Sequence, residues 1–423
     1  ILPTKAFNID FFIKEYKIAE KFDYYINEKL NLFFGLETKF IELNPGNKYP
    51  VGSESIISGI QIPTEKGVDT SPYISAVYHH NDRLAIDGGI RYSIFSLYGP
   101  VSVNQYSAGS PKQPEFTTGT EEYANNEHVK TYHGAEFRLS GRYSLDRRNS
   151  VKLSYNKTRQ NMHLLINSAS IAPTDIWRLS STYIKPQIAD QFSVGFYKNL
   201  NGKHIIETSI EAYYKNIQNL LDIRVGADLQ FNPNVETAIL QGQGKAYGVE
   251  LSLKKSDGWL TGWLNYTYSR SLIQLDGQFP EEVINNGSFF PTGYDKPHYI
   301  NSVTNYKFTR RLTMTLSLVY STGVPVTLPV GKWNLKSSEN IFYSDRNAYR
   351  IPDYFRLDLG INLDGSHKTK KLIHSSWNFS IYNLLGRDNI YSVFFKVENG
   401  VVEGYKLSVF TAAIPTLTYN FTF

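Results

Sequence analysis

The stretch LTMTLSLVYS, residues 312–321, alternates large apolar side chains with smaller, mostly polar ones. Because successive side chains of a β-strand point to opposite faces, this pattern predicts a strand with one oily and one hydrophilic face. The apolar positions are Leu312, Met314, Leu316, Leu318 and Tyr320. The stretch FRLDLGINLD, residues 355–364, repeats the pattern and places Arg356 and Asp358 on the polar face.

The same alternation returns along the whole chain, for example over residues 84–94, 135–143, 206–215 and 416–423. A soluble sandwich also contains such strands, but its turns need not recur at a fixed spacing. In this chain short polar turns recur at nearly constant intervals, centred on Asp82, Arg147, Gly202, Asp257, Arg310 and Gly365. Long polar or aromatic segments lie between them, at about 44–72, 99–129, 167–189, 226–244, 276–297 and 329–353. Short turns at one end and long loops at the other are typical of outer-membrane β-barrels.

The sequence therefore predicts an all-β protein, a transmembrane antiparallel β-barrel, of which fifteen strands can be counted. Their expected spans are 6–19, 28–43, 73–81, 83–98, 131–145, 150–166, 190–200, 204–225, 245–255, 259–275, 299–309, 312–328, 354–364, 372–397 and 404–423. Bacterial single-chain barrels close with an even number of strands. We therefore expect either an error of one in the count or the C-terminal part of a larger barrel, and the absence of a signal-peptide pattern at the start favours the second.

Composition argues against several other classes of protein. The 423 residues include no Cys, which excludes disulfide frameworks, thiolate metal sites and thiol nucleophiles. The formal net charge of +5 is spread over the chain without a basic run, so nucleic acid is not an expected partner. The nine His show no metal-ligand spacing, and neither a nucleotide-binding loop nor a nucleophile elbow is present. We predict no enzyme activity, no metal site and no cofactor.

Several stretches resemble the barrel of TonB-dependent outer-membrane receptors, particularly those of Bacteroidota. They are YIKPQIADQFSVGFYKN (183–199), IEAYYKNIQN (210–219), GKAYGVELSL (244–253), NYTYSRS (265–271), DKPHYIN (295–301), YSTGVPV (320–326), IYNLLGRDNIY (381–391) and the ending IPTLTYNFTF (414–423). The order of these stretches carries the resemblance. It implies a plugged barrel of about 22 strands, with residues 1–423 as its C-terminal part and the plug and first strands outside this sequence.

The resemblance also implies a function. Such a receptor binds a scarce nutrient (a siderophore, cobalamin, a glycan or a peptide) and imports it into the periplasm. The alternative is a receptor-like barrel that transports nothing and serves as a structural subunit or scaffold of an outer-membrane complex. The implied location is the bacterial outer membrane. The implied partners are its lipid, TonB through the plug region, the barrel assembly machinery, and a surface lipoprotein or other outer-membrane subunits.

Three groups of residues are candidates for these roles. Aromatic residues of the expected outer loops could grip a ligand or partner by stacking, or could pack the loops on one another: Trp177, Tyr183, Phe289, Phe290, Trp333, Tyr343 and Tyr349. Charged residues on the polar strand faces are expected to line the lumen and, by the resemblance, to contact a plug: Asp87, Arg91, Glu136, Arg138, Arg142, Glu207, Glu211, Arg356 and Asp358. The alternating aromatics at the end resemble a barrel-assembly signal and equally suit a lipid-facing girdle: Tyr419, Phe421 and Phe423.

Overall fold

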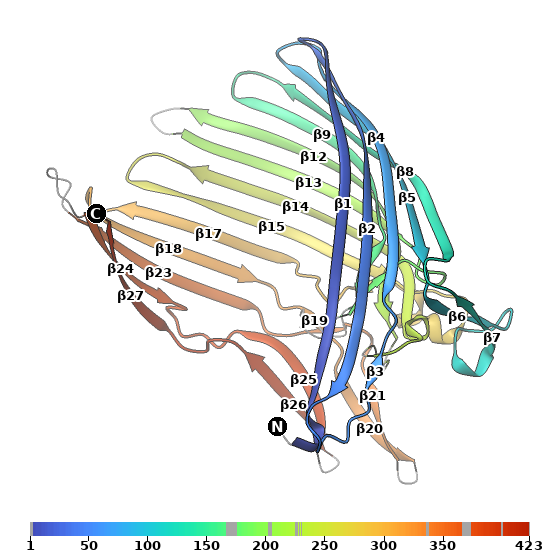
Figure 1. The fold of residues 1–423 in the computed structure, drawn as a ribbon. Coiled ribbons are helices and arrows are strands. Elements are labelled where there is room, and N and C mark those ends of the chain that lie inside the picture. Colours follow the sequence, from blue (N-terminus) through green and yellow to red (C-terminus); the bar gives the residue numbers. More distant parts are fainter. Residues whose placement is uncertain are drawn as a thin grey trace.

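A single antiparallel β-sheet forms the body of the molecule, with its strands arranged in sequence order (Figure 1). The structure, a computed structural model, describes residues 3–165, 176–201, 205–224, 227, 229, 231–335, 338–365, 374–398 and 401–422. Fifteen long strands make up the sheet: β1 (Phe7–Asn27), β2 (Leu30–Pro50), β4 (Glu65–His79), β5 (Leu84–Tyr98), β8 (His128–Ser144), β9 (Asn149–Gln160), β12 (Gln187–Asn201), β13 (Ile205–Ile223), β14 (Ile239–Lys255), β15 (Leu260–Gln274), β17 (His298–Lys307), β18 (Leu312–Ser321), β23 (Tyr354–Asp364), β24 (His374–Tyr382) and β27 (Ile414–Thr422).

Two short strands, β3 (Ile60–Gln61) and β16 (Phe290–Pro291), bring the sheet to 17 strands. The predicted all-β antiparallel barrel architecture and its fifteen long strands are confirmed. The sheet curves but does not close, because β1 and β27 form its two edges and no pairing joins them in the described part of the chain (Figure 1).

The two ends of the strands differ as predicted. We call the end with short connections, such as residues 28–29 between β1 and β2 and 80–83 between β4 and β5, the turn rim. At the opposite end, the loop rim, long connections carry their own hairpins: β6 (Val101–Tyr106) with β7 (Thr117–Tyr123), β10 (Met162–Leu165) with β11 (Ile176–Leu179), β19 (Pro325–Val326) with β22 (Tyr349–Arg350), β20 (Pro329–Leu335) with β21 (Ser338–Tyr343), and β25 (Ile390–Glu398) with β26 (Val401–Ser408). Short 3-10 turns lie at Pro3–Lys5, Pro114–Phe116, Val235–Thr237, Pro280–Glu282 and Asn285–Gly287.

The prediction of single strands over 372–397 and 404–423 is wrong. The chain leaves the sheet after Tyr382, forms the β25–β26 hairpin at the loop rim, and returns as β27 at Ile414. Asn383 and Gly386 adopt positive φ values of 53° and 57°, a left-handed conformation that lies outside the extended region of regular strand pairing and that here forms a turn. The apolar alternation on both sides of this turn concealed the interruption. A seventh long connection, residues 383–413, therefore belongs to the loop rim.

Other strand boundaries differ from the predicted ones by several residues. β1 and β2 extend to Asn27 and Pro50, well beyond the predicted ends, and β4 begins at Glu65 rather than near residue 73. The predicted loop 44–72 is therefore partly strand. Polar segments such as residues 44–50 still pair, because the backbone groups of neighbouring strands satisfy one another whatever the side chains are.

Hydrophobic clusters occur at the loop rim instead of in a central core. One contains Ile41, Leu43, Phe95, Leu97 and Leu179, so the β10–β11 hairpin packs against β2 and β5. A second cluster joins the β9–β12 and β13–β14 connections, and a third packs the β15–β17 connection against β13, β14 and β15. Across the strands, many large apolar side chains instead stay exposed on one face of the sheet, among them Leu139, Leu153, Phe192, Leu251, Leu264 and Leu417. In the described residues no helix has the length and hydropathy needed to cross a membrane.

Candidate functional site

All nine predicted lumen residues lie on one face of the sheet. Cross-strand partners share a face, and the register connects Glu211 through Gly195 and Lys152 to Arg142. It connects Asp358 in the same way, through Ser317, Val303, Trp263 and Lys254, to Glu207. We call this the interior face, because the β10–β11 hairpin folds onto it through Phe95. The outer face is the opposite one, which carries the exposed apolar side chains.

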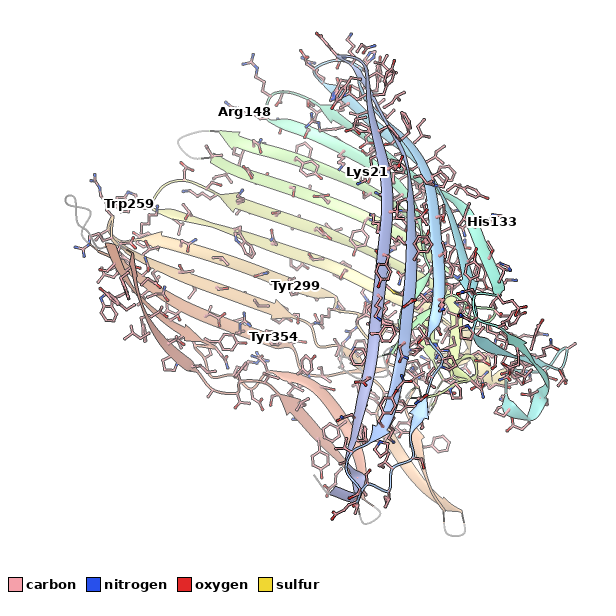
Figure 2. The ribbon with its side chains drawn as sticks, viewed as in Figure 1. Lys21, His133, Arg148, Trp259, Tyr299 and Tyr354 are labelled. Atoms are coloured by element: carbon pink, nitrogen blue, oxygen red, sulfur yellow. The ribbon has the colours of Figure 1, made fainter. Side chains whose placement is uncertain are left out.

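The charged residues of the interior face are covered to different extents. Asp87, Arg138, Arg142 and Glu207 are exposed, whereas Glu136 is buried. Figure 2 shows the side chains along the sheet, with Arg148 and Trp259 at the turn rim and Tyr299 and Tyr354 nearer the loop rim. Hydrated charges thus extend along β5 and β8, and the prediction that they contact a plug stays a prediction.

Arg91 joins three strands of the interior face. Its Nε lies 3.7 Å from Oε2 of Glu136, and its Nη2 donates to Ser71 Oγ at 2.9 Å. Ser71 donates in turn to Asp69 Oδ1 at 3.0 Å. The second oxygen of Glu136 accepts the backbone N–H of Arg159 at 2.7 Å. These contacts cross-link β4, β5, β8 and β9. In them the charged and polar side chains of the interior face serve as hydrogen-bond partners for one another.

Arg356 and Asp358 form a second polar group, at the loop-rim half of β23. Arg356 Nε lies 3.0 Å from Asp358 Oδ2, and the guanidinium sits 4.6 Å from the ring centroid of Tyr382. Asp358 Oδ1 accepts the backbone N–H of Asn383 at 2.9 Å. The carboxylate therefore holds the turn that ends β24, so these two predicted lumen residues also have a structural task.

The predicted loop aromatics divide into covered and exposed rings. Phe290 is 3% exposed and packs with Leu220 and Ile273, and Trp177 packs on the Leu43–Phe95 cluster. Tyr183 is half-buried and donates to the carbonyl of Asn104. The exposed ones are Phe289, Tyr343 and Tyr349. The side chain of Trp333 lies outside the described residues.

The β10–β11 hairpin takes part in two enclosed polar contacts that sequence reasoning did not single out. Glu65 Oε1 lies 2.7 Å from Arg178 Nε, and its Oε2 accepts the backbone N–H of Leu179 at 2.7 Å. His163 is 1% exposed and shares a hydrogen bond of 2.9 Å between Nε2 and Ser180 Oγ. Burial lowers the pKa of His163 from 6.5 to about 4, so its ring is neutral at neutral pH.

Asp295 places a fully covered carboxylate at the loop rim. Its side chain has no exposed area and contacts the guanidinium groups of Arg270, at 3.3 Å, and of Arg350. Its Oδ1 also accepts the backbone N–H of Ser271 at 2.7 Å, and its carbonyl accepts a bond from Arg350 Nη1 at 2.7 Å. The loop before β17 is thereby tied to β15 and β22. The motifs NYTYSRS and DKPHYIN, which are separate in the sequence, meet here through the pairing of Arg270 with Asp295. The sequence did not predict this contact.

The chain's last strand pairs with β24 and places the two described terminal aromatics on the outer face. Tyr419 packs against Trp377 with ring centroids 4.6 Å apart and the ring planes tilted by 41°, and Phe421 is 56% exposed. Phe423 lies outside the described residues. The assembly-signal role of this ending stays a prediction. Among the described residues, no group of three or more His, Asp or Glu is placed to hold a metal ion.

Comparison with known proteins gives this architecture its family. The family model described as TonB dependent receptor-like, beta-barrel matches residues 7–384. The chain belongs to this receptor β-barrel family. No curated protein sequence matches the receptor barrel at a significant level.

Solved structures share the fold of this receptor barrel. One is the pyoverdine outer membrane receptor FpvA from Pseudomonas aeruginosa, with a TM-score of 0.60 and 14% sequence identity; the match covers 98% of this chain and 54% of that chain. Another is the ferric yersiniabactin uptake receptor FyuA from Yersinia pestis, with a TM-score of 0.57 and 13% sequence identity; the match covers 99% of this chain and 56% of that chain. A third is the ferric-catecholate import receptor Fiu from Escherichia coli K12, with a TM-score of 0.54 and 14% sequence identity; the match covers 98% of this chain and 55% of that chain. The chain spans about half the length of each of these proteins. These family and structural relatives are transport receptors, not enzymes, and the family's setting is the bacterial outer membrane.

Proposed function

We propose that the receptor barrel belongs to a bacterial outer-membrane importer that binds a scarce nutrient at the loop rim and passes it through the interior to the periplasm, driven by TonB. The proposal rests on family membership together with one structural observation. The polar interior face extends along the strands between the two rims, and its exposed charges lie towards the turn rim. The loops at the loop rim pack on one another and are cross-linked by ion pairs.

The hydrated charges of the interior face favour passage of cargo through the barrel. Exposed charges such as Asp87 and Arg138 keep water along β5 and β8, and water or a polar plug can move past hydrated groups more easily than past an apolar lining. The loop rim suits recognition, because hairpins held by several ion pairs and hydrophobic clusters are pre-organised and lose less entropy on binding.

The cargo is proposed by class: a siderophore, cobalamin, a glycan or a peptide. Ferric siderophores are the first class to test, because the solved structures with this fold include receptors named for them. A Bacteroidota origin remains part of the proposal, as do the barrel assembly machinery and a surface lipoprotein as partners. Phe289, Tyr343 and Tyr349 are the ring contacts that we propose for cargo, because these three are exposed at the loop rim.

The decisive experiment is uptake by the full-length receptor in cells that lack their own receptor for the labelled cargo, with TonB present or deleted. Import is expected only with TonB. Replacing Phe289, Tyr343 and Tyr349 together by Ala should weaken cargo binding by about tenfold or more, since each aromatic contact contributes roughly 0.5–1.5 kcal/mol. Trp259→Ala is the matched control, because Trp259 is 57% exposed at the opposite rim.

The scaffold alternative makes the opposite prediction. A receptor that binds none of the four cargo classes, yet copurifies in fixed stoichiometry with other outer-membrane proteins regardless of TonB, would replace the importer proposal. Unchanged cargo binding in the triple aromatic variant would remove those residues from the cargo site while leaving import itself in place.

A further inference from the structure

Glu20 of β1 is a charged residue on the outer face of the sheet. Its neighbour Lys21, marked on β1 in Figure 2, is connected by the register through Gly35 and Tyr73 to Arg91 of the interior face. Because successive side chains of a strand point to opposite faces, Glu20 lies on the outer face, where it is exposed. In a membrane-embedded receptor barrel this face meets hydrocarbon.

The depth of Glu20 follows from the aromatic residues on either side of it. Tyr16 and Tyr24 lie on the same face, each four residues away, and are 62% and 60% exposed. Aromatic girdles mark the two boundaries of an apolar band about 25 Å tall, and a strand covers about 27 Å between these two tyrosines. Ile18 and Phe22 occupy the positions between them. Glu20 is therefore near the middle of the band.

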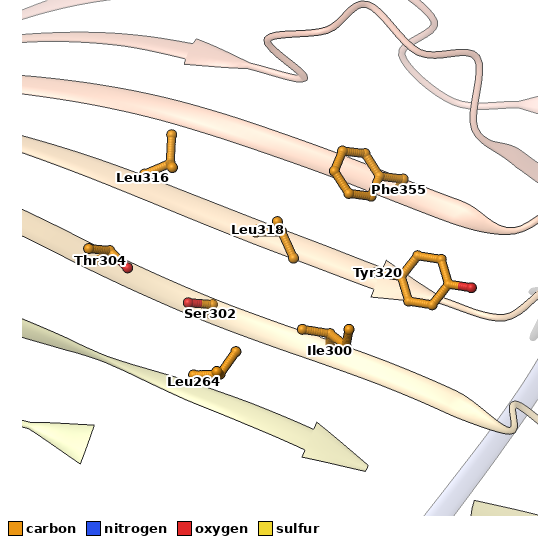
Figure 3. Close-up of a pocket in the computed structure, with 8 residues that line it drawn as sticks. All are labelled: Leu264, Ile300, Ser302, Thr304, Leu316, Leu318, Tyr320 and Phe355. Carbon is orange, nitrogen blue, oxygen red and sulfur yellow. The ribbon is translucent and has the colours of Figure 1, made fainter. Parts of the chain in front are cut away.

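Polar groups elsewhere on the outer face have partners. Figure 3 shows a stretch of this face from Leu264 on β15 through Leu316 on β18 to Phe355 on β23, and its side chains are apolar or carry a hydroxyl. The Ser302 hydroxyl in this stretch donates to the backbone carbonyl of Trp263 at 3.0 Å. Such a group is satisfied without water, as a lipid-facing surface requires.

The same holds for polar residues on other strands of the outer face. The hydroxyls of Thr38 and Thr70 share a hydrogen bond of 3.3 Å between β2 and β4. Lys157 of β9 and Asp190 of β12, which lie opposite each other in register, form an ion pair of 3.6 Å. On this face polar side chains are thus paired with neighbouring strands.

Glu20 has no such partner within the described part of the chain. Directly opposite it on β2 is Leu36, and no basic side chain forms an ion pair with it there. Lys14, on the same face of β1, is six residues away, about 20 Å along a strand. The second free edge of the sheet, β27, also lacks a cation on its outer face, which carries Leu417, Tyr419 and Phe421.

The free edge of β1 shows where a partner can come from. β1 pairs with β2 on one side only in the described structure. Unpaired backbone groups are costly in hydrocarbon, so a membrane-embedded β1 needs a strand on its other side as well. Directly opposed residues of two paired strands share a face, with Cβ atoms about 4.5–5.5 Å apart. A basic side chain on that strand can therefore reach the Glu20 carboxylate.

We propose that the strand pairing with the free edge of β1 in the full-length receptor carries a Lys or Arg on its outer face, opposite Glu20. A carboxylate at this depth is costly unless a cation pairs with it. The pair also fixes the register of the two strands, because a slip of one residue would move the cation to the interior face. The strand comes from outside these 423 residues, and the proposal does not depend on the cargo.

The experiment replaces Glu20 by Gln and, separately, by Leu in the full-length receptor. Each change leaves a cation unpaired in hydrocarbon and should lower the folded, protease-resistant fraction in the membrane about threefold or more. Asp23→Asn is the matched control, because Asp23 is an exposed carboxylate on the interior face of the same strand. It should leave the folded fraction unchanged.

An unpaired Glu20 predicts the opposite result. An uncharged side chain costs less in hydrocarbon than a lone carboxylate, so the Gln and Leu variants would then fold as well as the unmodified receptor or better. Either result would overturn the ion pair.

Charge reversal identifies the partner. Glu20→Lys should block folding, and in that background each outer-face Lys or Arg of the neighbouring strand is replaced by Glu in turn. Recovery of folding is expected in one of these double variants, because the pair is restored with its charges exchanged. A neighbouring strand without a Lys or Arg on its outer face, or no recovery in any double variant, would overturn the proposal.

Refolding of the purified receptor into dioleoyl phosphatidylcholine vesicles separates this pair from a contact with another protein. Glu20→Gln should fold as poorly there as in cells. A loss of folding in cells alone would assign the cation to another protein and overturn the pair within the receptor. Cargo uptake per folded receptor should stay normal in Glu20→Gln, so a failure of this inference is distinguishable from a failure of the importer proposal.

Discussion

Asp295 illustrates how a single residue can fix the loop rim. Its carboxylate is fully covered and faces the guanidinium groups of Arg270 and Arg350, whose side chains are each 27% exposed. A buried carboxylate is tolerated only when its oxygens are paired, and here backbone and side-chain donors share the task. Because these donors come from strand β15 and from the connection between β18 and β23, they hold the loop before β17 against both.

Replacing Asp295 by Asn should loosen the loop rim strongly. The change leaves two partly buried guanidinium groups without a counter-charge, a loss of about 3 kcal/mol for a broken buried pair. Hydrogen exchange of residues 291–297 and 349–353 should rise. Glu207→Gln is the control, because the Glu207–Lys254 pair is 3.5 Å apart and about half exposed, and exposed pairs contribute about 0–1 kcal/mol. Equal exchange in the two variants would contradict the assigned role of Asp295.

His163 makes the β10–β11 hairpin sensitive to acid. Its pKa is about 4 in the folded hairpin because the ring is buried, against 6.5 when unfolded. Between these values the unfolded hairpin takes up a proton that the folded one does not, so the packing loses stability as the pH falls from 6.5 towards 4. Hydrogen exchange of residues 176–179, corrected for the intrinsic pH dependence of the amides, should increase over that range. His163→Phe should remove this increase, and a persistent increase in the variant would assign the effect to another group.

At the scale of the strand, one alternating pattern determines two environments. Leu316 and Leu359 face each other across β18 and β23 on the outer face, while Thr315 and Gly360 do the same on the interior face. Thr315 donates to Asn305 Oδ1 at 2.7 Å, so the polar face is paired across strands as well. A shift of one residue in register would exchange the two faces completely.

Arg at Leu316 should block stable insertion, whereas Arg at Thr315 should not. A cation on the lipid side near the midplane costs roughly 2–4 kcal/mol, and the same cation in the interior meets water and other polar groups. Leu359→Arg should behave like Leu316→Arg. The measurement is the fraction of full-length receptor that reaches a folded, protease-resistant form in the membrane. Equal damage from Leu316→Arg and Thr315→Arg would contradict the assignment of the faces.

At the scale of the whole molecule, the sheet of the 423-residue chain has two free edges. β1, with 21 residues, and β27, with nine, each pair on one side only within the described structure. Unpaired N–H and C=O groups along such strands are strong templates for association, and they are costly in hydrocarbon. The family's larger barrels close their sheet, which removes both edges.

We therefore expect the 423-residue chain, produced by itself in detergent, to self-associate through its edge strands. Light scattering should report oligomers at concentrations where the full-length receptor is monodisperse. A monomer that resists heat in gel electrophoresis, as closed barrels do, would contradict this expectation and indicate that these fifteen strands close on their own.

The sequence by itself determined the class, the strand number and the faces, because alternation is a local property set by which side of each strand meets hydrocarbon and which meets water. The strand register accordingly places Leu316 and Leu359 on one face of the sheet and all nine charged residues together on the other. Only the tertiary structure decided what happens at the loop rim. The burial of Phe290, the pairing of Asp295 with Arg350 and the departure of the chain at Asn383 depend on contacts between segments distant in sequence, which no local pattern records.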